Sequence, residues 1–251
     1  MKFEDKKVIV TGANRSIGRK IAVDFAAEGA DVLISYRTDK AGADETVKMI
    51  EARGRRAWSL HADFSKIENV KDFSMQAIEH LEQVDLLINN ASMLSRETIF
   101  EISPELMQLV FQVNTISPLY LSKLIANHMI DKKTKGCITN ISSIAATTTM
   151  SKSIAYASSK AAMNKWTQNA ALNLAENGIR VNAIAPGVIQ SGMNQDTART
   201  DPELWRYYQE NIPLKRTGIP ADIANMALFI SSDDASWITG KIFEVDGGHV
   251  L

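Results

Sequence analysis

The stretch Lys7-Val-Ile-Val-Thr-Gly-Ala-Asn-Arg-Ser-Ile-Gly18 decides the fold. It begins as a short β-branched run, which favours a buried strand, and continues into a turn that contains two glycines. Apolar residues at helical spacing follow, and Gly29 can end that helix in a left-handed conformation. A second β-branched run, Asp31-Val-Leu-Ile-Ser-Tyr36, comes next. The first 36 residues therefore predict a strand–helix–strand unit with a glycine turn at the first junction.

The same alternation continues along the chain. Strands are expected at residues 7–11, 31–36, 57–61, 84–89, 137–141, 180–185 and 242–246, and further helices at 40–53, 66–82, 103–131 and 153–177. Nearly continuous apolar strands suit a parallel sheet that helices cover on both faces. The prediction is an α/β doubly wound Rossmann fold with a seven-stranded parallel sheet, one domain over residues 1–251, and ligands beyond the carboxyl ends of the strands.

Residues 190–219 interrupt this alternation. Glycines and prolines surround an aromatic-rich piece, Leu204-Trp-Arg-Tyr-Tyr208. Two interpretations remain open, a segment that covers the substrate pocket and a helical excursion on the surface.

Composition excludes several classes of function. The formal net charge is −1, from 28 basic and 29 acidic residues, so neither nucleic acid nor an anionic membrane is an expected partner. The lone cysteine, Cys137, cannot form an internal disulfide and lies in an apolar run, which favours a reducing compartment. No apolar stretch is long enough to span a bilayer, so a cytoplasmic location is expected. The four histidines are scattered without zinc-ligand spacing, so no metal is expected.

The glycine turn predicts a dinucleotide site. Glycines let the backbone approach a pyrophosphate, whose charge the N-terminus of the following helix favours. At the end of the second strand, Arg37 could join Arg15 of the turn around a 2′-phosphate, which favours NADP(H) over NAD(H). The alternative is two solvated arginines paired with Asp31 and Asp39. Asp63, after the third strand, would either receive a hydrogen bond from the adenine amino group or cap a helix.

Tyr156 and Lys160 are four residues apart, on one face of a predicted helix. An ammonium about 4 Å from a phenol contributes roughly 4 kcal/mol at an effective dielectric of about 20, which predicts a lowered tyrosine pKa. Ser143 ends the fifth strand thirteen positions earlier, so its hydroxyl could meet that of Tyr156 on one substrate oxygen. The spacing indicates acid–base chemistry on an oxygen.

With these motifs the chain resembles the short-chain dehydrogenase/reductase family over essentially its whole length. The likeness rests on Thr11 to Gly18, Asn89-Asn-Ala91, Pro186-Gly187, and a catalytic tetrad of Asn114, Ser143, Tyr156 and Lys160. It implies reversible hydride transfer to a carbonyl carbon, a homotetramer or homodimer, Lys160 bonded to the nicotinamide ribose, and Asn114 holding a water at a helix kink. The cofactor residues so expected are Gly12, Asn14, Arg15, Ser16, Ile17, Gly18, Arg37, Asp63, Phe64, Asn90, Ala91, Tyr156, Lys160, Pro186, Gly187, Ile189 and Ser191.

Three serines depart from the family pattern. Ser16 replaces the middle glycine of the turn, Ser92 replaces the glycine after Asn-Asn-Ala, and Ser191 replaces a threonine. The first and third are expected to affect cofactor affinity more than chemistry.

A mostly apolar pocket is expected for the substrate. It would draw on Ser143, Ala145, Met150, Tyr156 and Met193. The resemblance is nearest to 3-oxoacyl-acyl-carrier-protein reductases, through the pattern around Leu94-Ser-Arg96 and a basic cluster of Lys132, Lys133 and Lys135 that could dock the carrier. A second basic position of those reductases corresponds to Leu172. Glucose or ribitol dehydrogenases, hydroxysteroid dehydrogenases and a non-catalytic cofactor-binding scaffold are the alternatives.

Overall fold

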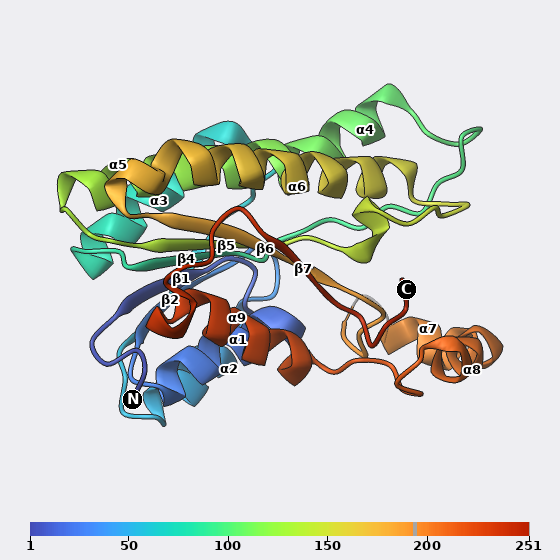
Figure 1. Ribbon diagram of the computed structural model, residues 1–251, viewed down its shortest axis with the longest axis horizontal. Coiled ribbons are helices and arrows are strands. Elements are labelled where there is room, and N and C mark those ends of the chain that lie inside the picture. Colours follow the sequence, from blue (N-terminus) through green and yellow to red (C-terminus); the bar gives the residue numbers. More distant parts are fainter. Residues whose placement is uncertain (193–194, 251) are drawn as a thin grey trace.

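A parallel sheet of seven strands forms the centre of the molecule (Figure 1). The computed structural model describes residues 1–192 and 195–250. The strand order is β3-β2-β1-β4-β5-β6-β7, so the chain reverses its direction of travel across the sheet between β1 and β4. Ligands of such sheets bind at that reversal, beyond the carboxyl ends of the strands. The strands are β1 (Lys7–Val10), β2 (Asp31–Tyr36), β3 (Ala57–His61), β4 (Leu86–Asn89), β5 (Cys137–Ile141), β6 (Arg180–Pro186) and β7 (Ile242–Val245).

Helices cover both faces of the sheet, which confirms the predicted fold class. Figure 1 shows α1 (Ser16–Ala27), α2 (Lys40–Glu51) and α9 (Pro220–Ser231) below the sheet, and α3 (Ile67–Leu81), α5 (Ser117–Asp131) and α6 (Ile154–Leu174) above it. Two separate clusters of buried apolar side chains correspond to these two layers. Helix α9 was not among the predicted helices.

The end of α1 follows the sequence prediction. Its buried face carries Ile21, Ala22 and Phe25, and Gly29 after it has a φ of +98°. The amide of Ala30 donates to the carbonyl of Phe25, which closes the helix end. A Cβ at Gly29 would lie 2.9 Å from the Cα of Glu4, so both the conformation and the space require glycine.

The helix predicted over residues 103–131 is three pieces. Helix α4 (Pro104–Phe111) leads into a π-helical turn, η1 (Gln112–Ile116), and then into α5. Pro118 stands in the first turn of α5 and has no N–H to donate back into the π-helical turn that precedes it. The apolar pattern continues through the junction, so the sequence predicted one helix. The π-helical turn places Asn114 inside the fold, and such turns are frequent at functional sites.

Two helices lie within residues 190–219. They are α7 (Gln195–Thr200) and α8 (Pro202–Asn211), which lie at the right-hand end of the molecule in Figure 1, near the C-terminus. Short 3-10 turns complete the described structure: η2 (Ile144–Ala146), η3 (Ala175–Asn177) and η4 (Asp233–Ala235). Across the two described ranges, no helix has the length and apolar character needed to cross a bilayer.

Candidate active site

Two adjoining cavities lie beyond the carboxyl ends of the strands. The first, of about 550 Å³, is bounded by the turn after β1, the end of β2 and the segments after β3 and β4. The second, of about 720 Å³, is bounded by the segments after β5 and β6, the start of α6, and α7 and α8. One elongated ligand could therefore occupy both. The residues that line both cavities are Ile17, Asn90, Ser92, Leu94 and Ser191.

The glycine turn builds one wall of the first cavity. Asn90 holds the turn, because its Nδ2 donates to the carbonyls of Thr11 at 2.9 Å and Gly12 at 3.0 Å. Gly12 has a φ of +63°, and a Cβ there would lie 2.9 Å from the Cα of Ala91. Helix α1 begins beside this cavity, and Arg15 at its N-cap provides no side-chain capping bond. The first N–H groups of α1 thus remain available, which fits the pyrophosphate of a dinucleotide.

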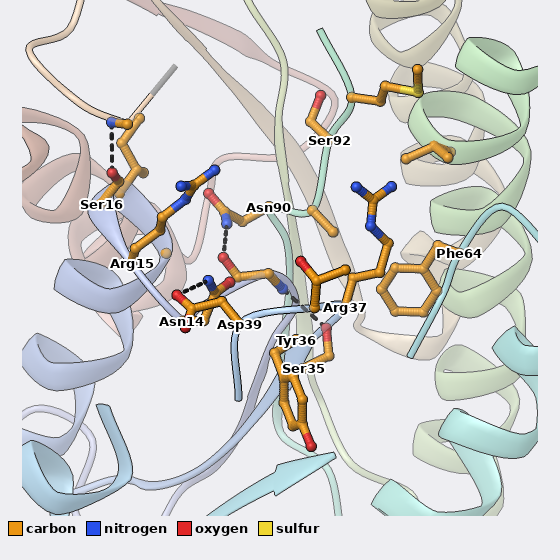
Figure 2. Close-up of a pocket in the computed structure, with 18 of the residues that line it drawn as sticks. Asn14, Arg15, Ser16, Ser35, Tyr36, Arg37, Asp39, Phe64, Asn90 and Ser92 are labelled. Atoms are coloured by element: carbon orange, nitrogen blue, oxygen red, sulfur yellow. Dashed lines mark hydrogen bonds between the residues drawn. The ribbon is translucent and has the colours of Figure 1, made fainter. Parts of the chain in front are cut away.

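The structure shows how the glycine turn accommodates Ser16, which replaces the middle glycine of the family pattern. Its φ is +52°, a conformation that favours glycine. Figure 2 shows its hydroxyl accepting a hydrogen bond from the amide of Gly192, at 2.8 Å. This bond connects the glycine turn to the segment that leads into α7, and it offsets part of the backbone strain.

Two arginines face the first cavity. In Figure 2 the side chains of Arg15 and Arg37 lie on either side of Asn90. Within the part of the chain that the structure describes, neither has an ion-pair partner within 4 Å. Both guanidinium groups are therefore available to a ligand.

Among the described residues neither arginine forms an ion pair with Asp31 or Asp39, but both side chains are exposed, so the alternative of two solvated arginines is not contradicted. Burial would raise the pKa of Asp31, but hydrogen bonds from Lys7 and Arg56 outweigh it and lower that pKa to about 2. Asp39 instead accepts hydrogen bonds from the amide of Gly42 at 2.8 Å and from Asn14 at 3.1 Å. Both contacts lower the pKa of Asp39, and the nearby charge of Arg15 adds to them.

Asp63 and Phe64 also line the first cavity. Asp63 does not cap the next helix, because α3 begins at Ile67 with Lys66 at its N-cap. Its Oδ1 instead accepts a hydrogen bond from the amide of Ser65 at 3.0 Å, which forms a local turn. An aspartate just before a helix has the same sequence pattern in such a turn as in an N-cap. The Phe64 ring packs edge-on against Phe73, with centroids 5.5 Å apart.

Ser143, Tyr156 and Lys160 meet in the second cavity. Tyr156 is in the first turn of α6, and its phenol lies near enough to the Ser143 hydroxyl for that group to lower the phenol pKa. Lys160 follows one turn later and is 1% exposed. Its Nζ donates to the carbonyl of Ile141 at 2.7 Å and lies 5.8 Å from the centre of the Tyr156 ring. The two hydroxyls and the amine thus converge as their spacing predicted.

The predicted pKa of Tyr156 has the opposite direction in this structure. Burial raises it, and the nearby Ser143 hydroxyl offsets only part of that effect. Burial also lowers the pKa of Lys160 to about 7. A poorly solvated site disfavours both the phenolate and the ammonium, and the four-residue spacing does not reveal that burial.

Asn114 is buried in η1 with every hydrogen-bonding position of its amide engaged. Its Oδ1 accepts from the amide of Met93 at 2.8 Å and from Ser92 Oγ at 3.0 Å. Its Nδ2 donates to the carbonyl of Met93 at 2.9 Å and to Ser159 Oγ at 3.0 Å. The amide therefore joins the segment after β4 to the helix that carries Tyr156.

The turn after β6 forms another wall of the second cavity. A Cβ on Gly187 would lie 2.7 Å from the Cα of Asp246, so the close contact with the C-terminal segment requires glycine. Ile189 forms a parallel bridge with Gly218, which fixes the path of the chain before α7. Four residues predicted to bind the cofactor line this cavity, namely Pro186, Gly187, Ile189 and Ser191.

The substrate candidates have different outcomes. Ala145 and Met150 line the second cavity, whereas Met193 lies outside the described residues. Residues 190–219 contribute Thr197, Leu204, Trp205 and Tyr208 to the lining, so this helical segment also covers the cavity. The aromatic-rich piece Leu204 to Tyr208 had suggested in the sequence that residues 190–219 could cover the substrate pocket.

His249 is a cavity residue that the sequence did not indicate. It reaches the second cavity from the C-terminal end and packs against Tyr208, with ring centroids 5.9 Å apart. No local motif marks it, because only the fold brings the C-terminal end to α8. Among the described residues, no three His, Cys, Asp or Glu side chains gather in a way that could hold a metal ion.

This fold and site define a class of protein, the oxidoreductases that act on alcohol or carbonyl groups. The family model described as enoyl-(acyl carrier protein) reductase matches residues 12–249. The chain belongs to the short-chain dehydrogenase/reductase family, whose members bind NAD(P).

Individual relatives show the range of the family. Glucose 1-dehydrogenase 2 of Bacillus subtilis is 37% identical over 247 residues, 98% of this chain and 95% of the relative. L-Rhamnose 1-dehydrogenase (NADP(+)) of Thermoplasma acidophilum is 34% identical over 99% of this chain and 98% of its own length. A solved structure of 7α-hydroxysteroid dehydrogenase, complexed with NADH and 7-oxo glycochenodeoxycholic acid, has a TM-score of 0.92 at 35% identity, covering 98% of this chain and 95% of that one.

Proposed function

We propose that this protein transfers hydride reversibly between NADP(H) and a carbonyl or secondary alcohol, with Asn114, Ser143, Tyr156 and Lys160 as its catalytic residues. The observation that carries the proposal is that Ser143, Tyr156 and Lys160 line one cavity, which adjoins the glycine turn. A nicotinamide that extends from the first cavity into the second would reach them.

Each residue would have a distinct task. The nicotinamide supplies or accepts the hydride when it is bound. During reduction Ser143 would orient the substrate oxygen, and Tyr156 would donate the proton to it; oxidation reverses both roles. Lys160, close behind the phenol, would stabilise negative charge there and bond the nicotinamide ribose. Asn114 would hold the segment after β4 against the helix of Tyr156.

A carrier-bound 3-oxoacyl substrate receives little support from the fold. Lys132, Lys133 and Lys135 follow α5 and precede β5, so they lie at the amino ends of the strands. Both cavities lie at the carboxyl ends. Leu172, at the second docking position, is an exposed apolar residue. A carrier docked on this lysine cluster would be at the wrong edge of the same subunit's sheet.

We infer that the substrate is a free alcohol or ketone with a largely apolar body, the chemistry of a hydroxysteroid. Ile144, Met150, Leu204, Trp205 and Tyr208 provide apolar and aromatic walls in the second cavity. An aldose is the second candidate, because the hydroxyls of Thr148, Thr149 and Ser151 line the same cavity.

An acidic substituent on the substrate would also suit this cavity. Arg96 and Lys152 line it, and no carboxylate does so among the described residues. Neither cation has an ion-pair partner within 4 Å in the described chain. Lys152 is near enough to Glu101 for its charge to lower the pKa of that carboxyl group, so Lys152 is partly neutralised. Arg96 is therefore the stronger candidate for binding an anion.

Nicotinamide absorbance with a panel of carbonyl compounds tests the proposed function. The panel should contain steroid ketones, an acetoacetyl thioester and, with NADP⁺, aldoses; one keto acid should be compared with its methyl ester. We expect turnover with a free ketone or alcohol and greater efficiency for the acid than for the ester. Cofactor binding without turnover of any compound would support the non-catalytic scaffold instead.

The cofactor preference has its own test, the substitution Arg37→Asp. We expect the wild-type protein to prefer NADPH, and the variant to lose about 10- to 100-fold in kcat/KM for NADPH, because a charged hydrogen bond is replaced by repulsion. Efficiency with NADH should change little. Arg53→Asp, an exposed position that lines neither cavity, is the matched control. A wild-type preference for NADH that Arg37→Asp leaves unmoved would contradict the assignment.

We also propose that the chain forms a homodimer or homotetramer through the helices over residues 103–131 and 153–177. The support is a set of exposed apolar side chains on α4, α5, α6 and the turn η1, namely Leu109, Ile116, Leu119 and Leu172. Such side chains are suited to burial between subunits.

A further inference from the structure

A chain of three hydrogen bonds connects the junction of the two cavities to the catalytic helix. Ser92 Oγ donates to Asn114 Oδ1 at 3.0 Å, Asn114 Nδ2 donates to Ser159 Oγ at 3.0 Å, and Ser159 Oγ donates to the carbonyl of Tyr156 at 2.7 Å. All three donate in the same direction, an arrangement in which each bond polarises the next. The chain ends on the residue that we propose as the proton donor.

The backbone of Met93 fixes the orientation of the Asn114 amide. Its N–H donates to Oδ1 and its carbonyl accepts from Nδ2, so the two ends of the amide cannot be exchanged. One acceptor position on Oδ1 then remains, and Ser92 occupies it. Without the Ser92 hydroxyl, a nearly inaccessible acceptor would lose a partner or take one from the cavities.

Ser92 also has a distinctive location. It is one of the few residues that line both cavities, at the point where a nicotinamide ribose would pass. Its donor hydrogen is used for Asn114, which leaves the hydroxyl oxygen as an acceptor toward the cavities. The same hydroxyl therefore touches the ligand space and determines the state of a buried amide.

We infer that Ser92 is a positioning residue for the proposed reaction, acting through Asn114 and Ser159 on the backbone at Tyr156. Ser92 holds the amide in a single hydrogen-bonding state and prevents a cavity water or ligand from competing for Oδ1. The inference rests on the proposed function, since it concerns the rate of proton transfer at Tyr156.

The test compares Ser92→Ala and Ser92→Thr with the wild type in steady-state turnover. We expect Ser92→Ala to lower kcat about 5- to 20-fold while KM for the cofactor changes less than twofold, because the loss falls on the placement of Tyr156. Ser92→Thr retains the hydroxyl and should restore most of kcat. A wild-type kcat in Ser92→Ala would overturn the inference.

A double-mutant cycle separates action through Asn114 from an independent role. In an Asn114→Ala background, the further change Ser92→Ala should lower kcat less than twofold. An undiminished loss would show that Ser92 acts elsewhere and would overturn the inference. Ser122→Ala is the matched control, since Ser122 accepts from buried Asn89 at 2.9 Å away from both cavities. It should reduce stability without lowering kcat.

Failure of this inference and failure of the proposed function give different results. If the wild type turns over and Tyr156→Phe does not, the function stands whatever the Ser92 variants do. If the wild type shows no turnover, the proposed function fails. A lower stability of Ser92→Ala than of Ser92→Thr would then still show that the Ser92 hydroxyl holds the Asn114 amide, whereas equal stability would show that it does not.

Discussion

Tyr156→Phe is expected to lower kcat by about 100- to 10,000-fold, the range for removal of a positioned acid–base group. The substitution removes only the hydroxyl near Ser143, and the ring keeps its place in the first turn of α6. Because the phenol pKa is raised by burial, Tyr156 holds its proton in this structure and is suited to donate it during reduction. Initial rates of NADPH oxidation, with cofactor binding followed by fluorescence, measure the effect.

Tyr207→Phe provides the matched control. Tyr207 is exposed on α8 and lines neither cavity, although its neighbour Tyr208 lines the second. Its kcat should stay within twofold of the wild type. If Tyr156→Phe also retained wild-type turnover while binding cofactor, the proton would have to come from another group and the proposed mechanism would be wrong.

Lys160→Met is expected to lower kcat by about 100- to 1,000-fold, the range for losing one preorganised electrostatic partner. The methionine fills a similar volume but cannot donate to Ile141 or stabilise charge on the Tyr156 oxygen. Lys165→Met, at an exposed position on the same helix, should leave kcat unchanged. Equal losses in both variants would indicate damage to α6 and would contradict a specific role for Lys160.

The same variant predicts a pH dependence of stability. The pKa of Lys160 is lowered from 10.5 to about 7, so the cost of burying the ammonium is fully present below pH 7 and declines as the pH rises toward 10.5. At about 1.4 kcal/mol per pH unit, the wild type should gain about 2 to 3 kcal/mol from this group between pH 6 and pH 9.

Lys160→Met lacks that gain, so its stability relative to the wild type should be most favourable at pH 6. Urea unfolding of both proteins at the two pH values measures the difference, with Lys165→Met as the control. A difference between the variant and the wild type that does not change with pH would show that Lys160 has an ordinary pKa in the folded protein.

Local sequence was sufficient for much of the fold and the site. β-Branched runs located all seven strands, with boundaries that differ by at most two residues. The four-residue spacing of Tyr156 and Lys160 placed both on one helix face, and strand ends carried Ser143 and Arg37 to the cavities. These features depend on short-range periodicity and on one rule of parallel sheets, so they can be derived without coordinates.

Features that depend on burial or on distant segments could not be derived in this way. The direction of the Tyr156 pKa depends on how little solvent reaches it, which spacing does not reveal. The π-helical turn at Asn114 leaves the apolar pattern unbroken, so periodicity alone predicted one helix, and only the family resemblance implied a kink there. His249 and Gly192 reach their partners only through the tertiary fold.

The hydrogen bond from Gly192 to Ser16 has a consequence for protein engineering. Changes of substrate scope would be sought in α7 and α8, which come after Gly192 in the chain and line the second cavity. Any displacement of that segment pulls on Ser16, the first residue of α1, whose backbone is already in a left-handed conformation. If Ser16 binds the dinucleotide as proposed, a library selected there for new substrates is expected to change cofactor affinity as well, so both properties should be measured in every round of selection.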